Sequence, residues 1–254
     1  ATNNLFNVTG RTYVAWNWKA NGTGVSNTVG TIPSTVSANT TSGFSVVSYT
    51  GNNTSGATVG HGLGIAPSMV ICKNRTAGTG SGAWPVWHSS LSSVTSYVFL
   101  NTTAAQASGN NNFTAAPTST VLKLGTSDTN NTATMVAYCF AEVPGYSAIG
   151  SYTGNGSADG TFVHLNFRPS WLLIKQTNSG SFNWNLIDTS RSPFNTADDL
   201  LAPNANNAEV VSGFVDAVSN GFKCRNSSAY VNGSGSTYIY MAFAENPFKN
   251  SNAR

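Results

Sequence analysis

The side chains best suited to ligand chemistry in this sequence are aromatic rings beside amide and hydroxyl groups. Trp87 and His88 are adjacent, Asp188 stands at the position of a second repeat that corresponds to His88, and Tyr230 lies among Asn and Ser residues. Flat apolar rings next to amide and hydroxyl donors suit the binding of sugar rings. We therefore predict these four residues as a ligand-binding set, with burial in a core as the alternative for the tryptophan.

Hydrolytic chemistry has less support in the sequence. Ser89 and Ser90 follow His88, but no GxSxG motif is present, and the segment GHGLG around His61 lacks the helix and lysine of a phosphate-binding loop. A glycosidase carboxylate pair could come only from scattered acids, which are more often exposed on loops: Asp159, Asp198, Asp199, Glu209 and Asp216. We predict no enzymatic activity, no catalytic residue and no cofactor.

The three cysteines, Cys72, Cys139 and Cys224, lie far apart in apolar contexts typical of strands. An odd number without short spacing indicates neither a disulfide framework nor a metal site. We expect buried free thiols, because cysteine is among the most frequently buried residues.

Composition narrows the classes of partner. The 12 basic and 9 acidic side chains give a net charge of +3 and form no basic run, so nucleic acid is not an expected partner. No apolar run approaches the roughly 18 residues of a membrane span, so no membrane contact is expected. Only 8% of residues are charged but 40% are hydrophobic, in bursts of strand length, which indicates an ordered, turn-rich, all-β protein.

A strand pattern that must position these residues occurs three times, as TYVAWNWKA from Thr12, TMVAYCFAE from Thr134 and TYIYMAFAE from Thr237. Alternate residues are large and apolar, which is the period of a strand with one face on a core. The other face carries small or amphipathic residues rather than charges. We therefore expect a strand that is covered on both faces.

Further matches in one order indicate two homologous halves. Residues 48–52 (SYTGN) match 151–155, Trp84 matches Trp184, and His61 is aligned with His164. Such repetition at a period of about one hundred residues is typical of duplicated units. We expect Trp84 and Trp184 to serve packing, because they recur.

The predicted fold is all-β, with two tandem homologous β-sandwich units of jelly-roll-like type at residues 43–145 and 146–254. Residues 1–19 are predicted to be the closing strand of an upstream unit, and the Gly-, Ser- and Thr-rich residues 20–42 a linker. The best helical candidate is the short segment NTADDLLAP from Asn195, for which we expect a turn or two at most.

Several long strings resemble a known family: AWNWKA, SYTGN, VGHGLGIAPSMVICKN, VAYCFAEVPGYS and YIYMAFAENPFK. They are similar to a repeated domain at the C-terminal end of large virion proteins of marine bacteriophages, mostly regarded as tail-fibre or tail-associated proteins. The resemblance implies an extracellular virion structural protein that contacts other virion proteins and forms homo-oligomers, with a trimer favoured because tail fibres are commonly trimeric. It supplies no catalytic motif.

The expected function is attachment to host-surface glycans by a tail fibre or a similar appendage. One alternative is a capsid or tail decoration or assembly protein without a ligand of its own. A second alternative is a polysaccharide depolymerase that uses acids of the second half.

Overall fold

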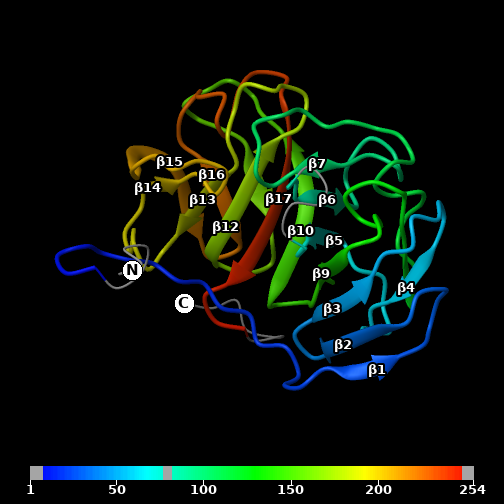
Figure 1. Ribbon diagram of the computed structural model, residues 1–254. Helices are drawn as coiled ribbons and strands as arrows, with labels where there is room; N and C mark the ends of the chain where they lie inside the picture. Colours follow the sequence, from blue (N-terminus) through cyan, green and yellow to red (C-terminus); the bar gives the residue numbers. More distant parts are fainter. Residues whose placement is uncertain (1–7, 77–81, 248–254) are drawn as a thin grey trace.

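The computed structural model describes residues 8–76 and 82–247, and these ranges contain β-strands without any helix (Figure 1). The predicted all-β class is confirmed. The strands of the first half are β1 (Val25–Asn27), β2 (Ser34–Asn39), β3 (Phe44–Thr50), β4 (Thr58–Gly60), β5 (Met69–Asn74), β6 (Pro85–His88), β7 (Val98–Phe99), β8 (Val121–Lys123) and β9 (Thr134–Phe140). Those of the second half are β10 (Ser147–Thr153), β11 (Phe162–His164), β12 (Pro169–Gln176), β13 (Asn185–Asp188), β14 (Ala197–Leu201), β15 (Val210–Val218), β16 (Gly221–Cys224) and β17 (Thr237–Ala244).

The strands form three antiparallel sheets. A 7-stranded sheet has the order β1-β2-β3-β9-β5-β6-β7, and β4 pairs with β8 in a small sheet of the same half. An 8-stranded sheet of order β10-β17-β12-β13-β14-β15-β16-β11 forms the second half and curls into a nearly closed barrel. Its two edges approach where the Thr161 hydroxyl donates a hydrogen bond to the Thr153 carbonyl at 2.8 Å.

The repeated strand is covered on both faces, as predicted, in its second and third occurrences. In β9, Cys139 packs in the core of the first half while Phe140 faces the second half. In β17, Ala242 packs inside the barrel while Phe243 faces the first half. Both strands lie between two neighbours in their sheets, and together they contribute side chains to the three cores formed by the described residues.

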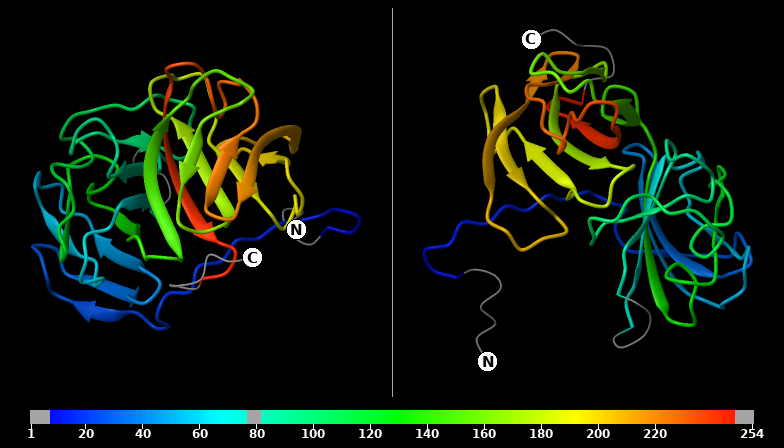
Figure 2. Two further views of the ribbon diagram at one scale, coloured as in Figure 1. Left: turned by 180° about the vertical axis from the view of Figure 1, so that it is seen from behind. Right: turned by 90° about the horizontal axis from the view of Figure 1, so that it is seen from above.

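The two large sheets pack face to face through a core that both halves share. Figure 2 shows the halves side by side. The buried side chains of this shared core are Phe44, Met69, Ile71, Val86, Leu91, Val98 and Phe140 from the first half, and Ile149, Trp171, Leu173, Trp184, Leu186, Ile239, Met241 and Phe243 from the second. Trp184 thus has the packing role expected of it, and Trp84 packs against the same core. The halves are therefore layers of one structure as well as units with cores of their own.

Matching hydrogen bonds occur at corresponding positions of the two halves. The Tyr49 hydroxyl donates to the Thr129 carbonyl at 2.5 Å, and Tyr152, 103 positions later, donates to the Val231 carbonyl at 2.6 Å. The SYTGN motif thus fixes the loop that leads into the closing strand, because a buried hydroxyl needs a partner.

A buried asparagine follows the same plan in each half. The Asn130 amide donates to Asn52 Oδ1, the Thr54 carbonyl and the Gly125 carbonyl, and Asn130 Oδ1 accepts the backbone N–H of Asn52. In the second half, Asn232 makes the corresponding bonds to Asn155, Ser157 and Asn226. These equivalent networks explain why the asparagine of SYTGN recurs.

The N-terminal part differs from two expectations. Of the predicted closing strand at residues 1–19, residues 1–7 lie outside the described residues. Residues 12–18 form no strand here; they are extended, and their alternating pattern inserts Trp16 and Trp18 against the shared core. Residues 20–42 are more than a linker, because they contain β1 and β2, which extend the sheet beyond β3. Ile32 and Val36 from this segment belong to the core of the first half.

Two details of the second half also differ from expectation. The segment from Asn195 forms β14, because pairing with β13 and β15 overrides its weak helical pattern. His164 matches Gly60 rather than His61, because the two face Gly221 and Val121 in equivalent pairs of strands. His61 is buried and hydrogen-bonded, whereas His164 is exposed.

Since both halves contribute to the shared core, we expect the protein to unfold in a single cooperative transition. Phe243→Ala should lower the free energy of unfolding by about 3–5 kcal/mol, the usual cost of removing a buried phenyl ring, while Val25→Ala, at a side chain that is 67% exposed, should change it by less than about 0.5 kcal/mol. Calorimetry and denaturant titration measure both effects. Two separate transitions, one for each half, would show that the shared core does not couple them.

Candidate ligand-binding surface

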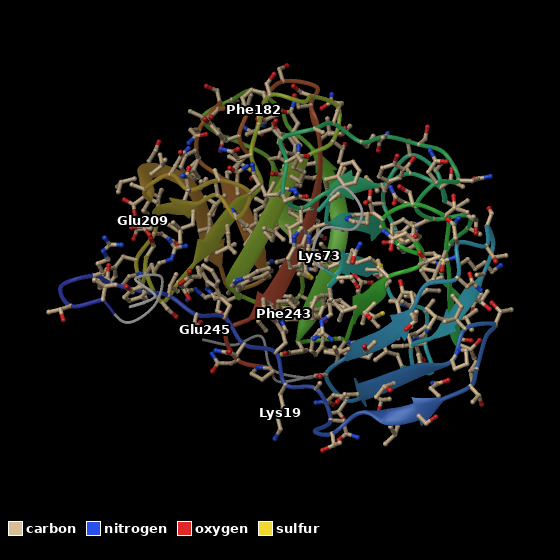
Figure 3. All side chains as sticks on the ribbon, viewed as in Figure 1. Lys19, Lys73, Phe182, Glu209, Phe243 and Glu245 are labelled. Carbon is tan, nitrogen blue, oxygen red and sulfur yellow. The ribbon has the colours of Figure 1, made fainter. Side chains whose placement is uncertain are left out.

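Tyr230 and Phe182 form an aromatic pair on loops of the second half. Tyr230 follows β16 and is 39% exposed, while Phe182, partly exposed, precedes β13 (Figure 3). Their rings meet edge to face with centroids 5.4 Å apart, and buried Phe214 supports Tyr230 at 6.2 Å. The pair presents apolar ring surface and a tyrosine hydroxyl that has no hydrogen-bond partner within the described ranges. This combination suits a sugar ring, which offers both C–H faces and hydroxyl groups.

The loop that carries Tyr230 is held by a chain of amide and hydroxyl contacts. Asn185, completely buried, donates to the Tyr230 carbonyl at 2.8 Å, and the Tyr230 N–H donates to Ser228 Oγ at 3.3 Å. Asn226 in turn accepts the Ser228 N–H at 3.0 Å and donates to the Gly213 carbonyl at 3.0 Å. A loop fixed in this way loses little conformational entropy when it binds a ligand.

The loop that carries Phe182 is fixed by two asparagines. The Asn204 side chain donates to Asn183 Oδ1 at 2.7 Å and accepts the Trp184 N–H at 2.9 Å. The Trp184 indole N–H donates to the Phe99 carbonyl of the first half at 2.8 Å. The aromatic pair is therefore anchored to the shared core through Trp184.

His88 has a structural environment. It is 1% exposed, its Nδ1 accepts the Ser90 N–H at 3.1 Å, and its Nε2 lies 3.2 Å from the Tyr240 carbonyl on β17. This geometry requires a neutral ring with the proton on Nε2, which donates across to the second half. Burial lowers the pKa of His88 to about 4, in agreement with a neutral imidazole.

Asp188, the counterpart of His88, caps the same turn in the second half. Its Oδ1 accepts the backbone N–H groups of Ser190 and Arg191, and its Oδ2 accepts Arg191 Nε at 2.7 Å and Trp16 Nε1 at 3.3 Å. Arg191 also pairs with Glu209. Asp188 is 3% exposed, so its carboxylate is satisfied by protein groups and is closed to a sugar.

Trp87 lies in the core of the first half, and its indole N–H donates to the Val94 carbonyl at 3.0 Å. The structure does not bring Trp87 and His88 to one surface with Asp188 and Tyr230. Of the four predicted ligand-binding residues, Tyr230 alone has substantial exposed area. Phe182 was missed because its approach to Tyr230 depends on two loops that are distant in sequence.

The acids of the second half are engaged with neighbouring side chains. The Ser192 hydroxyl donates to Asp199 Oδ2 at 2.8 Å, with Asp198 Oδ1 at 3.3 Å, and its oxygen accepts the backbone N–H groups of both residues. Asp159 pairs with Lys223, which lowers the pKa of its carboxyl, and Asp216 pairs with Arg225 at 3.2 Å. The described ranges hold no cluster of three or more histidine, cysteine or acidic side chains arranged to bind a metal ion.

The three cysteines are free and buried, as expected. Burial raises the pKa of the Cys139 and Cys224 thiols to about 12, so they remain protonated. No helix in the described part of the chain is long and apolar enough to cross a membrane.

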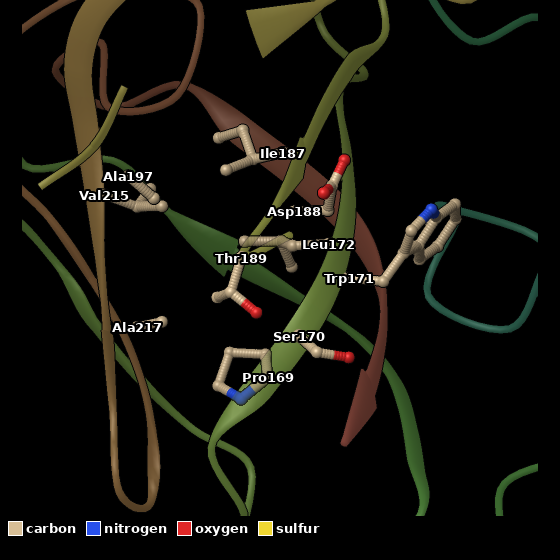
Figure 4. Close-up of a pocket in the computed structure, with 10 residues that line it drawn as sticks. All are labelled: Pro169, Ser170, Trp171, Leu172, Ile187, Asp188, Thr189, Ala197, Val215 and Ala217. Atoms are coloured by element: carbon tan, nitrogen blue, oxygen red, sulfur yellow. The ribbon is translucent and has the colours of Figure 1, made fainter. Parts of the chain in front are cut away.

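A small pocket lies between β12, β13 and β15, with Leu172, Ile187, Ala197 and Val215 around it (Figure 4). Its volume of about 10 Å³ is at the lower limit for one water molecule. It is too small for a sugar ring, so the exposed aromatic pair is the better candidate for ligand contact.

The chain belongs to a family defined by a domain of unknown function, DUF7483, whose model matches residues 1–247. The match covers both halves and the N-terminal segment. No curated protein matches the chain. No solved structure matches it either.

Burial of His88 predicts a pH-dependent stability. An unfolded histidine gains a proton near pH 6.5, whereas folded His88 stays neutral until about pH 4. The free energy of unfolding should therefore fall as the pH drops from 6.5 to 4, by about 1.4 kcal/mol per pH unit for each such histidine. Burial also lowers the pKa of His61, which adds to the same trend.

Denaturant titration at a series of pH values tests the contribution of His88. His88→Gln should reduce the slope below pH 6.5, while His164→Gln, at an exposed position, should leave it unchanged. An unaltered slope in His88→Gln would contradict the buried neutral ring.

Proposed function

We propose that this protein is a structural component of a bacteriophage virion, in a tail fibre or similar appendage, and that it attaches to host-surface glycans. The observation that carries the proposal is the pair of rings formed by exposed Tyr230 and partly exposed Phe182, on loops rich in asparagine and serine that hydrogen bonds hold in place. Aromatic rings with adjacent amides bind sugars through C–H contacts and hydrogen bonds.

The sequence resemblance to phage virion proteins supports the setting, and the packing supports the mechanical role. A shared core between the halves gives a compact scaffold of low charge, on which loops at one end of the barrel can vary without disturbing the strands. In this proposal the protein is part of the extracellular virion, where it contacts other virion proteins and forms a homo-oligomer. An assembly role without a glycan ligand is the competing function.

Binding to an array of bacterial surface polysaccharides and to host cells tests the attachment role. Tyr230→Ala should weaken binding at least about ten-fold, since exposed aromatic contacts at the centre of a binding surface commonly contribute more than 1 kcal/mol. Phe162→Ala is the matched control, because this phenylalanine is 45% exposed on the edge strand β11; it should bind as the parent does.

Thermal unfolding of both variants separates a loss of binding from a loss of folding. If the parent protein binds neither the glycans nor the cells, attachment is wrong and the assembly role gains support. If the parent and Tyr230→Ala bind equally well, the aromatic pair is not the binding surface.

A further inference from the structure

Residues 12–20, here called the strap, cross from the second half to the first along the margin of the shared core (Figure 2). The Trp18 ring lies 5.8 Å from Phe140, 5.2 Å from Trp171 and 5.6 Å from Phe243, measured between ring centroids. These three rings belong to β9, β12 and β17, so both halves contribute aromatic rings that pack against this indole.

Trp16 provides a second anchor two residues earlier in the strap. Its indole N–H donates to the buried Asp188 carboxylate at 3.3 Å, and the Arg191 guanidinium lies 5.8 Å from its ring centroid. The residues that contact the strap, here called the seam, are Phe140, Trp171, Asp188, Arg191 and Phe243. The seam receives two tryptophans that are two residues apart, which is the spacing of side chains on one face of an extended chain.

Side chains, rather than the backbone, hold the strap in place. Within the described ranges, the backbone of residues 12–18 makes no hydrogen bond, although the sequence has the strand pattern of β9 and β17. Tyr13 is 51% exposed and Val14 is 37% exposed. Near the end of the strap, the Asn39 amide donates to the Lys19 carbonyl at 3.0 Å. Few hydrogen bonds to the strap's backbone must therefore break for the strap to leave its seam.

A short hinge joins the strap to β1. Gly22 has φ +71°, a conformation that glycine adopts easily and other residues rarely, and no atom lies within 4 Å of the position that a Cβ would take. The Ser37 hydroxyl holds this hinge, because it donates to the Gly22 carbonyl at 2.8 Å and accepts the Asn21 N–H at 3.0 Å. A substitution at Gly22 therefore acts through backbone conformation and these two hydrogen bonds, without a side-chain clash with the core.

We propose that the strap is exchangeable and that it docks in the seam of a second copy of this chain. An exchanged strap makes the same contacts to Phe140, Trp171, Phe243 and Asp188 as it does in its own chain. The exchange therefore loses only the advantage that the covalent link gives a strap in binding to its own chain. For a short linker, that link is equivalent to an effective strap concentration of about millimolar. Copies held close together in an assembly overcome this cost, and the strap then links neighbouring subunits.

Gly22→Pro in the full chain tests the proposal, because proline holds φ near −65° and directs the strap away from its own seam. Light scattering across a wide range of protein concentration should show that Gly22→Pro forms oligomers at a concentration at least about ten-fold lower than the parent. Gly22→Asn is the matched control, since asparagine tolerates positive φ; it should behave as the parent does.

A double variant links the oligomer to the strap. Adding Trp18→Ala to Gly22→Pro should abolish the oligomer, whereas adding Asn17→Ala, at an exposed strap position, should preserve it. Near-UV circular dichroism confirms that each variant is folded. The proposal is overturned if folded Gly22→Pro stays monomeric at every concentration, or if its oligomer persists without Trp18. Neither result depends on glycan binding.

Discussion

The burial of both faces of β9 and β17 is the constraint on which the rest of this structure depends. A strand with one apolar face can border solvent, but these two strands are apolar on both, and each large buried side chain contributes roughly 1.5–3 kcal/mol. One face is covered within each half, by the remainder of its own repeat. The other face is covered only when the two large sheets meet, which creates the shared core.

Closing that core requires polar groups at its margin to find partners. Three polar groups bond to backbone carbonyls of the opposite half: the His88 ring, the Trp184 indole and the Lys175 ammonium. Lys175 is completely buried and bonds the carbonyls of Thr103 and Gln176, and burial lowers its pKa to about 8. Such bonds fix how the sheets align, because an unpaired buried donor is costly.

The halves complete their cores in different ways. The first half uses Ile32 and Val36, brought by the segment that contains β1 and β2. Among the described residues, no strand extends the sheet of the second half beyond β10. Larger rings fill its interior, with Tyr238 and Tyr240 at the places of Met135 and Ala137. Gly150 leaves room for this arrangement, since the position of its Cβ would lie only 2.7 Å from the Tyr240 hydroxyl. The barrel thus closes without added strands.

The sequence by itself determined the all-β class and the two covered faces of the closing strand, because the alternation of side chains in a strand is a local property. It also indicated the recurrence of SYTGN, but not the buried Asn130 and Asn232 that bind it from distant loops. The fate of residues 12–18 was decided by tertiary structure, since the same alternation that makes β9 a central strand serves here to insert two indoles. Likewise, the sequence singled out Tyr230, whereas the burial of Trp87, His88 and Asp188, and the approach of Phe182, depend on how the two halves and their loops meet. Exposure is a property of the folded surface, so residue type and spacing could not decide it.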